Sequence, residues 1–383
     1  MIITPNRTSV ETFLITAVER VQRNCVRFDT RFPNYGDDHR YVLRENNNWL
    51  AAFWPGMLWL AYDQTGDSTL RDRGDALLPT FETRLDRQIH ITHDLGFLFT
   101  LSVRAQYQLT GDPAARALAL RAADLLAARL HVKGRYVQAW GSVGDPGEGG
   151  RTIMDTMLNV PLLFWAAAES GNPTYGSIAL DHARTTAAHL MRPDGSTFHT
   201  FLFDQQTGAP LGGATHQGVS DDSLWARGQA WGILGFAIAA DWEPEQPFLR
   251  RAARKLARRF MAELPGDDVP LWDFWLPAGA PRYRDSSAAA IALCGLQRLI
   301  QVDAAHAEEY RTYANRLLSA LLNHCWDEDP NAQGLLKHGA LHIPKGIAVD
   351  AYLIFGDYFM LEALMRFSGS APEFWGVPST QKE

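Results

Sequence analysis

A two-part unit recurs along this chain, and it constrains the fold more than any other feature of the sequence. Each unit has a stretch with helical spacing that is apolar nearly all round, a short polar turn, and an amphipathic stretch rich in Ala, Leu and Arg. NVPLLFWAAA and AWGILGFAIAA are two of the apolar stretches. A helix that is apolar all round is buried, whereas a helix with one apolar stripe lies at the surface. The repeat therefore predicts two layers of helices.

The chain contains six such units. The apolar stretches begin near Trp49, Asp94, Thr152, Ser223, Ser286 and Ala351. The amphipathic stretches cover Val10–Cys25, Leu70–Leu85, Ala114–Leu130, Thr174–Leu190, Pro247–Leu264 and Ala305–Leu322. Six buried helices that alternate with six half-exposed ones predict an all-α fold, an (α/α)6 barrel with an inner and an outer ring. We expect a single domain over residues 1–383, because no linker divides the chain.

The connections between units contain short turns and two long loops. In Thr65-Gly66-Asp67 and Thr110-Gly111-Asp112-Pro113, Gly suits the left-handed end of one helix and Asp caps the next. Residues 132–151 and 191–222 are much longer connections, and 196–201 has a strand-like pattern. Long loops on a rigid scaffold usually carry function, so we expect these at the functional mouth of the barrel.

Charge and cysteine content exclude several classes of protein. The formal net charge is −7, so a nucleic-acid partner, which requires a basic face, is not expected. Cys25, Cys294 and Cys325 are widely spaced and predict idle thiols in a reducing compartment. The chain starts without a signal-peptide pattern, and its longest apolar run, Val160–Ala168, is too short to cross a bilayer. We expect a cytoplasmic protein with no membrane contact and no obligate protein partner.

The starts of the inner helices are the expected place for a site. If inner helices alternate with outer ones, all inner helices run the same way, and their N-termini share one mouth. Asp222, Asp285 and Asp350 lie at such starts and are interpreted as helix caps, because Asp is a favoured cap. Asp94 differs, since it follows two histidines and precedes the apolar run LGFLFTL, where a charge has little structural use.

Asp155 is the residue least like a cap, because it lies inside the apolar run 153–158. A bare charge in such surroundings is unfavourable, so the carboxyl must be partnered or protonated. Desolvation raises its pKa, and a raised pKa is what a general acid requires near neutral pH. We therefore predict a functional role for Asp155.

Tryptophans supply a second signal, since the chain has twelve of them. Indole rings stack on the apolar faces of sugar rings, whose hydroxyls need hydrogen-bond partners at the edge. Trp49 and Trp225, beside Asn48 and Arg227, are candidate binding residues, whereas Trp59, deep in its helix, is predicted to be core.

The sequence does not favour a metal or a cofactor. His90 and His93 have an i, i+3 spacing that permits metal ligation, but no third clear ligand is visible. The chain has no phosphate-binding loop, serine nucleophile elbow or HExxH motif, and the Gly-rich segment 144–150 is not placed between a strand and a helix. We predict neither a metal nor a cofactor.

At these positions the sequence resembles the unsaturated glucuronyl hydrolases, a glycoside hydrolase family, along nearly the whole chain. The matching stretches are Asn48-Trp49, Phe53-Trp54, His93-Asp94-Leu95-Gly96-Phe97, Gln138-Ala139-Trp140-Gly141, 151–159, Phe198-His199-Thr200-Phe201, Thr215-His216-Gln217-Gly218, 225–232, Tyr283-Arg284-Asp285-Ser286-Ser287-Ala288 and Gly356-Asp357-Tyr358. The family's fold is an (α/α)6 barrel. The resemblance implies a substrate oligosaccharide with a 4,5-unsaturated uronic acid at its non-reducing end, which polysaccharide lyases produce.

The resemblance also assigns roles to residues. It places the two catalytic carboxylates on Asp94 and Asp155. Its sugar-contacting positions fall on Trp49, His93, Trp140, His199, Gln217, Trp225 and Arg227. Protonation of C4 by Asp155 would create an oxocarbenium-like cation at C5 for water to attack, and Asp94 would orient hydroxyls and stabilise positive charge.

Two departures from the family pattern bear on substrate choice. Ala51-Ala52 replaces an Asp-Gly that is frequent at the mouth in the family. Members selective for sulfated sugars carry two Ser and a Lys before the last inner helix, whereas here the stretch 340–345 has Lys345 and neither Ser. Lys345 is thus a candidate binding residue, and an unsulfated uronyl disaccharide is the expected substrate.

Three other functions remain open from the sequence. A hydrolase of unsaturated galacturonyl-rhamnose from pectin would share the fold and the mechanism. A sugar epimerase would need paired histidine bases, for which His93, His199 and His216 are available. A non-catalytic carbohydrate-binding protein would have no need of a buried acid at position 155.

Overall fold

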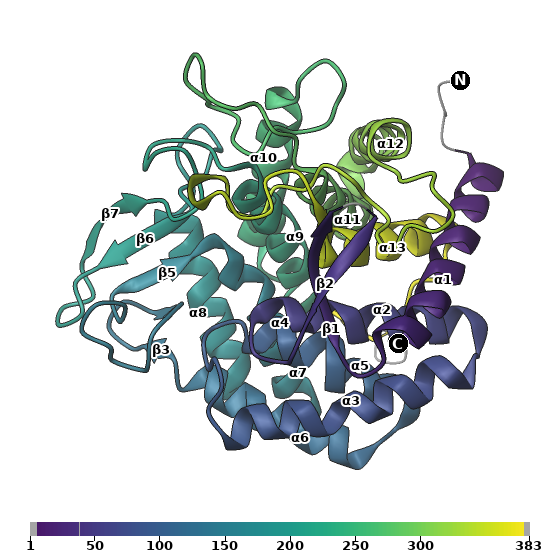
Figure 1. Cartoon of the computed structure of the whole chain (residues 1–383). Coiled ribbons are helices and arrows are strands. Elements are labelled where there is room, and N and C mark those ends of the chain that lie inside the picture. The colour runs from purple at the N-terminus through teal and green to yellow at the C-terminus, as the bar shows by residue number, and fades with distance from the viewer. Residues whose placement is uncertain (1–5, 38, 379–383) are drawn as a thin grey trace.

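The predicted two layers of helices are present in the computed structural model, which describes residues 6–37 and 39–378. Within these residues the inner layer has six members, and the second of them is continuous from α4 through the π-helical η2 into α5 (Figure 1). They are α2 (Phe53–Thr65), α4 (Leu95–Phe99) with η2 (Thr100–Arg104) and α5 (Ala105–Thr110), α7 (Pro161–Ser170), α9 (Ala226–Trp242), α11 (Ser286–Val302) and α13 (Ile354–Ser368).

The outer layer alternates with the inner one along the chain, as the repeat predicts. Its members, again within the described residues, are α1 (Arg7–Phe28), α3 (Ser68–Asp86), α6 (Pro113–Ala127), α8 (Pro173–His189), α10 (Pro247–Glu263) and α12 (Ala307–His324). Each inner element packs against the next inner element, and α13 packs against both α11 and α2, which closes the ring. Figure 1 shows α1 beside α13, so the first and last helices of the chain lie side by side. The (α/α)6 barrel is confirmed.

Capping explains how the inner and outer helices are joined. Gly66 ends α2 and Gly111 ends α5, each in the left-handed conformation, with φ of 68° and 72°. The next residue caps the following helix: the Asp67 carboxylate accepts from a backbone N–H of α3, and Asp112 does the same for α6. Residues 171–172 repeat this arrangement between α7 and α8. The turn prediction is confirmed at these positions.

Of the three aspartates interpreted as caps of inner helices, only Asp285 has this role. Its carboxylate accepts from the backbone N–H of the residue two positions on, at the start of α11. The N-cap positions of α9 and α13 are Trp225 and Leu353, so the cap interpretation is wrong for Asp222 and Asp350. Both helices begin directly from extended backbone, and the backbone N–H at the start of α9 pairs with a neighbouring segment instead.

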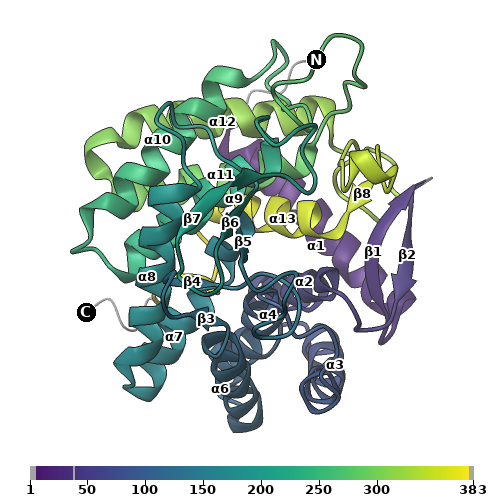
Figure 2. The same ribbon diagram turned by 90° about the vertical axis from the view of Figure 1, so that its left-hand side faces the viewer.

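Short strands occupy the connections at the barrel mouth. One sheet has the order β2 (Arg40–Arg44), β1 (Phe32–Asp37), β8 (Tyr352–Leu353), and a second pairs β3 (Leu130–His131) with β4 (Tyr136–Val137). The third has the order β5 (Arg151–Ile153), β6 (Thr200–Phe203), β7 (Pro210–Ala214). It lies near the middle of the view in Figure 2, apart from β1 and β2 at the right-hand edge. Strands β6 and β7 lie in the second predicted long loop, 191–222, and β5 begins at the last residue of the first, 132–151.

Register in the third sheet sets the geometry of the site. Ile153 of β5 lies opposite Thr200 of β6, and the Met154 backbone N–H donates to the His199 carbonyl oxygen at 2.9 Å. Antiparallel pairing therefore brings the residue after β5 next to the residue before β6. Asp155 and His199 are neighbours for this reason, although 44 positions separate them in the sequence.

The position of Trp59 and the state of the three cysteines agree with the predictions from the sequence. Trp59 is buried in the core, and Cys25, Cys294 and Cys325 are buried and unpaired. Taken singly, none of the helices in the described residues has both the length and the apolar character of a membrane span; the segments 286–302 and 304–324 would meet that test only as a pair bent by 115°.

Candidate active site

A cavity of about 230 Å³ opens at the starts of the inner helices. Its lining comes from all parts of the mouth except the start of α11. The lining residues are Trp49, His90, His93, Asp94, Phe97, Trp140, Ile153, Asp155, His216, Gln217, Leu341, His342 and Ile347. Of the residues predicted for the site, six line this cavity together: Trp49, His93, Asp94, Trp140, Asp155 and Gln217.

The other four predicted residues lie around the cavity rather than in its lining. The His199 and Trp225 ring centroids lie 4.2 Å apart with the ring planes tilted by 35°, and both side chains are buried. Arg227 is buried behind them, with its guanidinium 4.5 Å from the Trp225 ring. Lys345 is exposed on η5 (Ile343–Lys345), outside the lining.

Asp155 follows β5 at the second position of η3 (Met154–Leu158), and only 13% of its side chain is exposed. Burial raises its pKa to about 7, although the positive charge of Arg227 opposes the shift; the negative charge of Asp94 adds to it. Its Oδ2 atom has no hydrogen-bond partner. A carboxyl in this state exchanges its proton near neutral pH, as a general acid must.

Asp94 has the opposite character in the same cavity. Burial would raise its pKa, but interactions with His93, His90 and the Thr92 hydroxyl outweigh burial and lower the pKa to about 2. The Thr92 hydroxyl donates to Oδ2 at 2.8 Å, and His90 Nε2 lies 3.3 Å from the same oxygen. Asp94 is therefore ionised at neutral pH, when Asp155 is still partly protonated.

His93 and His199 each direct one ring nitrogen at a carboxyl group. The Nδ1 atom of His93 accepts from the Asn159 amide at 3.2 Å, so its proton is on Nε2, which lies 3.4 Å from Asp94 Oδ1. The Nδ1 atom of His199 accepts from the backbone N–H groups of residues 216 and 217, so its proton is also on Nε2, 3.7 Å from Asp155 Oδ2. Burial lowers the pKa of both rings, that of His93 to about 4, so both are neutral donors.

Several buried polar atoms of the site have no hydrogen-bond partner in the part of the chain that the structure describes. They are Asp155 Oδ2, His93 Nε2, His199 Nε2, Trp231 Nε1 and both ring nitrogens of His342. An unpaired buried donor or acceptor costs about 1–3 kcal/mol, so such atoms are rare unless a ligand or water pairs with them. Their concentration here indicates a site built for a ligand with many hydroxyl groups.

An ion pair fixes one wall of the cavity. Arg227 Nη1 donates to Asp285 Oδ2 at 2.7 Å and to the Ala340 carbonyl oxygen, and Nη2 donates to the Leu341 carbonyl oxygen at 2.6 Å. Gln217 Nε2 donates to the same Leu341 oxygen at 2.7 Å. The side chains of Arg227 and Gln217 thus hold the loop that contributes Leu341 to the cavity.

The sequence prediction missed His342 and gave His216 only a minor role. Their rings lie 5.1 Å apart, and the His216 ring also lies 4.9 Å from Trp140. Burial lowers the pKa of His342 to about 4, with smaller contributions from His216 and Lys345. The available signal was the position of His342 in the long segment before the last inner helix, where mouth-side residues are expected.

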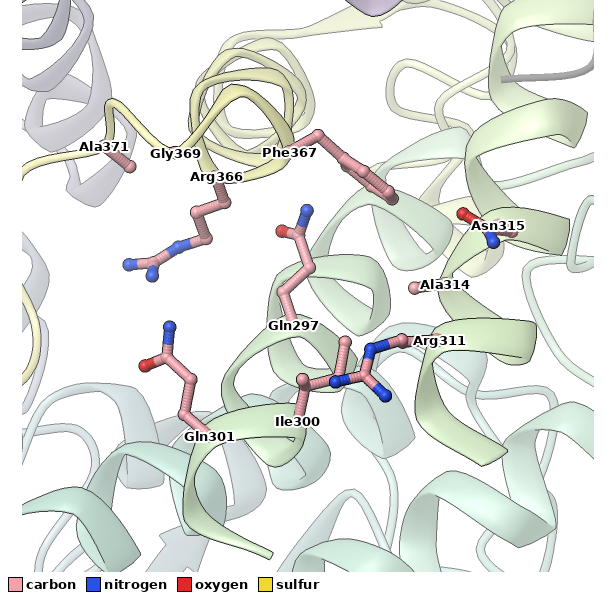
Figure 3. A pocket seen from close by; sticks show the side chains of 10 residues that line it. All are labelled: Gln297, Ile300, Gln301, Arg311, Ala314, Asn315, Arg366, Phe367, Gly369 and Ala371. Carbon is pink, nitrogen blue, oxygen red and sulfur yellow. The ribbon is translucent and has the colours of Figure 1, made fainter. Parts of the chain in front are cut away.

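A larger cavity, of about 410 Å³, lies away from the mouth, beside the last turns of α11 and α13 (Figure 3). Its side chains include Gln297, Gln301, Arg311, Arg366 and Phe367. The lining has no carboxyl group and no imidazole, so this cavity lacks the groups for acid catalysis. The smaller cavity at the mouth is the candidate active site.

The described residues contain no group of three His, Cys, Asp or Glu side chains that could hold a metal ion. His90 and His93 instead face the Asp94 carboxylate. The mouth of the barrel therefore offers proton-transfer groups, indole rings and hydrogen-bond donors.

An (α/α)6 barrel with a buried acid, an ionised carboxylate and indole rings at its mouth defines a carbohydrate-active hydrolase. The sequence profile of Glycosyl Hydrolase Family 88 matches residues 24–363. The chain belongs to this family.

Known relatives agree in sequence and in structure. An unsaturated glucuronyl hydrolase from Bacillus sp. (strain GL1) is 42% identical over 359 residues, 92% of this chain and 95% of the relative. An unsaturated chondroitin disaccharide hydrolase from Streptococcus pyogenes serotype M1 is 40% identical over 366 residues, 94% of this chain and 91% of the relative. A crystal structure of the Bacillus sp. GL1 enzyme has a TM-score of 0.92 at 40% identity, covering 96% of this chain and 99% of that one.

Proposed function

We propose that this enzyme releases 4,5-unsaturated glucuronic acid from the non-reducing end of oligosaccharides that polysaccharide lyases produce. The observation that carries the proposal is the pair of carboxyl groups at the mouth: Asp155 with a pKa raised to about 7, and Asp94 with a pKa lowered to about 2. Such a pair separates the roles of proton donor and permanent negative charge. The names of the relatives support the same substrate class.

The reaction follows from the chemistry of the vinyl ether. The C4=C5 electron pair takes the Asp155 proton at C4, and the O–H electrons stay on Asp155 as carboxylate. The positive charge at C5 is shared with the ring oxygen. Water then adds to C5 and returns a proton to Asp155. The hemiketal opens and the leaving sugar departs, so the glycosidic oxygen is not the first atom protonated, unlike in ordinary glycoside hydrolysis.

Asp94 is proposed to stabilise the cationic intermediate and to bind the ring hydroxyls. Its charge is fixed by the donors around it, so it accepts hydroxyl hydrogen bonds and stabilises positive charge at C5 without taking the proton. The Nε2–H of His93 and that of His199 have no hydrogen-bond partner among the described residues, so both can donate to the substrate.

The remaining predicted residues form the sugar-binding surroundings. Trp49 and Trp140 line the cavity and offer ring faces to the sugar. Gln217 contacts the cavity directly, and we propose that Trp225, Arg227 and Lys345 contribute through the wall and rim on which they lie. The volume of about 230 Å³ suits one sugar ring, with the second ring at the opening.

An unsulfated uronyl disaccharide is our proposed substrate, because the loop at 340–345 has a lysine without the two serines of sulfate-selective members. The pectin-type alternative, an unsaturated galacturonyl-rhamnose, would use the same carboxyl pair. We propose that the barrel acts as one catalytic domain. The three buried, unpaired thiols support a reducing compartment, and we propose the cytoplasm.

One assay tests the proposal. Unsaturated uronates absorb ultraviolet light through the C4=C5 bond, and hydration destroys that absorbance, whereas epimerisation or simple binding preserves it. The purified enzyme should remove the absorbance of unsaturated disaccharides from a panel of chondroitin, hyaluronan, heparin, xanthan, gellan and pectin lyase products. Persistence of the absorbance with every member of the panel would refute the proposal.

A further inference from the structure

Asn159 is a buried asparagine at the C-cap of η3, four positions after Asp155. It does not line the cavity, so it is not placed to contact a sugar. Each polar group of its side chain is nevertheless paired. Its Oδ1 atom accepts from the backbone N–H of Phe97 at 2.7 Å, and Nδ2 donates to His93 Nδ1 at 3.2 Å and to the Asp155 carbonyl oxygen at 3.3 Å. One side chain thus connects the segment that carries Asp94 with the segment that carries Asp155.

The orientation of the Asn159 amide follows from its partner on α4. A backbone N–H can only donate, so the atom that faces Phe97 is the amide oxygen, and the NH2 group faces His93. An NH2 group can also only donate, so His93 Nδ1 accepts and the ring proton is on Nε2. The Thr156 hydroxyl, 2.9 Å from the same Nδ1, can donate or accept, so it suits either tautomer. The amide is therefore the group that selects the tautomer.

The two segments also meet backbone to backbone at this point. Gly96, on α4, packs directly against the backbone of Asn159, and a Cβ atom at position 96 would collide with it. The side chain and the backbone of Asn159 therefore both set the distance between the start of α4 and η3. Asp94 and Asp155 lie at these two places, so their separation depends on the same contacts.

We propose that Asn159 is a positioning residue, which keeps His93 in the Nε2–H tautomer and holds the segments of Asp94 and Asp155 at a fixed separation. This inference rests on the proposed function. In the wild type, His93 Nε2 lies 3.4 Å from Asp94 Oδ1, and the ring lines the cavity. With the proton on Nδ1 alone, the lone pair of Nε2 would face the carboxylate and repel it, and Nε2 could not donate to a sugar hydroxyl.

The charged and titratable groups around the His93 ring do not set its tautomer. Asp94 faces Nε2, and His90 faces Asp94. The Arg129 guanidinium acts on the charge of the ring but is itself bound to backbone carbonyl oxygens. These contacts leave the Nδ1 side of the ring to the amide and the hydroxyl of η3 and its C-cap.

The test is Asn159→Asp, with Gln297→Glu as a matched control. The aspartate keeps an acceptor for the Phe97 N–H but presents a second oxygen to His93, so we expect Nδ1 to gain a proton while Nε2 keeps its own. Nitrogen-15 NMR of labelled histidine near neutral pH, with His93→Gln to assign the signals, should show Nε2 alone protonated in the wild type and both nitrogens protonated in the variant.

Turnover should change with the spectrum. The positive ring weakens the stabilisation that Asp94 gives to the cation at C5, and the bridge to the Asp155 carbonyl oxygen is lost. We expect kcat to fall by roughly tenfold to a hundredfold, since a displacement of about 1 Å at a site can cost about 10²-fold in rate. KM should change by less than about threefold, because the Nε2–H remains available to the sugar.

The control removes a similar donor far from the mouth. Gln297 is buried on α11, its amide donates to the Ala363 carbonyl oxygen of α13, and it lines the larger cavity in Figure 3. Gln297→Glu should leave the His93 signals and kcat unchanged. An equal loss of kcat in the control would mean that Asn159 acts only through packing, and would overturn the inference.

The wild-type spectrum keeps the inference testable even if the Asn159→Asp variant does not fold. A wild-type His93 protonated on Nδ1 alone would overturn it, as would a folded variant with the wild-type tautomer and full kcat. Failure of the proposed function would instead appear as no loss of ultraviolet absorbance with the wild type, with the nitrogen-15 spectrum still readable.

Discussion

At the scale of single residues, the site depends on two aspartates in one cavity that differ in their hydrogen-bond donors. Asp94 has the Thr92 hydroxyl and two imidazoles around it, so its charge is stabilised. Asp155 is buried and has an oxygen without a hydrogen-bond partner among the described residues, so its proton is retained to a higher pH. Burial alone would raise the pKa of both groups; the donors decide which one stays ionised.

Asp155→Asn should lower kcat by at least about 10²–10⁴-fold, because a positioned acid contributes that much. Binding should persist, since the indole rings and the other donors are unchanged. Stopped absorbance assays measure the first effect, and quenching of tryptophan fluorescence by an unsaturated disaccharide measures the second. Turnover of the variant at the wild-type rate would remove Asp155 from the mechanism.

The pH dependence of kcat should follow the same residue. The reaction needs protonated Asp155, whose pKa is raised to about 7. Activity should therefore be high below pH 7 and fall roughly tenfold per pH unit well above it. Asp94, with a pKa of about 2, should leave no inflection between pH 5 and 9. A rate that rises through neutral pH would contradict the assignment of Asp155 as an acid.

Sequence could predict Asp155 and Asp94 but not every neighbour. A carboxylate inside an apolar run can be recognised from the sequence alone. The pairing of β5 with β6, which puts His199 beside Asp155, cannot be recognised in this way. The register of two strands depends on contacts between distant segments. For the same reason the prediction missed His342, whose two unpaired ring nitrogens become evident only when the loop is seen folded against His216.

At the scale of elements, Asp285 connects three parts of the mouth. It caps α11, pairs with Arg227 of α9, and accepts from the Ala340 backbone N–H of the loop before α13. The sequence predicted the cap but not the ion pair, since Asp at a helix start is common and its second partner lies 58 residues away. Capping was predictable where the signal is local, and the prediction failed at α9 and α13, which begin directly from extended backbone at Trp225 and Leu353.

Asp285→Asn should destabilise the fold by about 3–5 kcal/mol, because it leaves the buried Arg227 charge without its counterion. KM should rise, since the loop that carries Leu341 is released. Denaturant unfolding and steady-state kinetics measure the two effects. The control is Asp222→Asn, at an exposed aspartate that does not cap a helix, and it should change neither value; an equal loss in both variants would show that the Asp285 network has no special role.

At the scale of the whole molecule, the buried carboxyl of Asp155, the proposed acid, should reduce the stability of the fold at neutral pH. The folded-state pKa of Asp155, about 7, lies above its ordinary value of 3.8. Its contribution to stability is therefore fully present below pH 4 and lost as the pH rises through 7. In Asp155→Asn this loss is absent.

The difference in unfolding free energy, variant minus wild type, should accordingly grow between pH 5 and pH 8, by up to about 3 kcal/mol. Denaturant titrations of both proteins at the two pH values measure it. Using the difference removes the opposite contribution of the buried histidines, whose lowered pKa values favour folding as the pH rises. If the unfolding free energies of the two proteins changed equally between the two pH values, Asp155 would not have a raised pKa in the folded state.

Closure of the ring by α13 against α2 has a kinetic consequence. The cavity wall draws on residues from Trp49 to Ile347, so no half of the chain contains a working mouth. Pairings between such distant positions form late, because the intervening chain must be ordered first. During refolding, helical circular dichroism should therefore return well before catalytic activity, and newly made chains should become competent only after the last inner helix has docked.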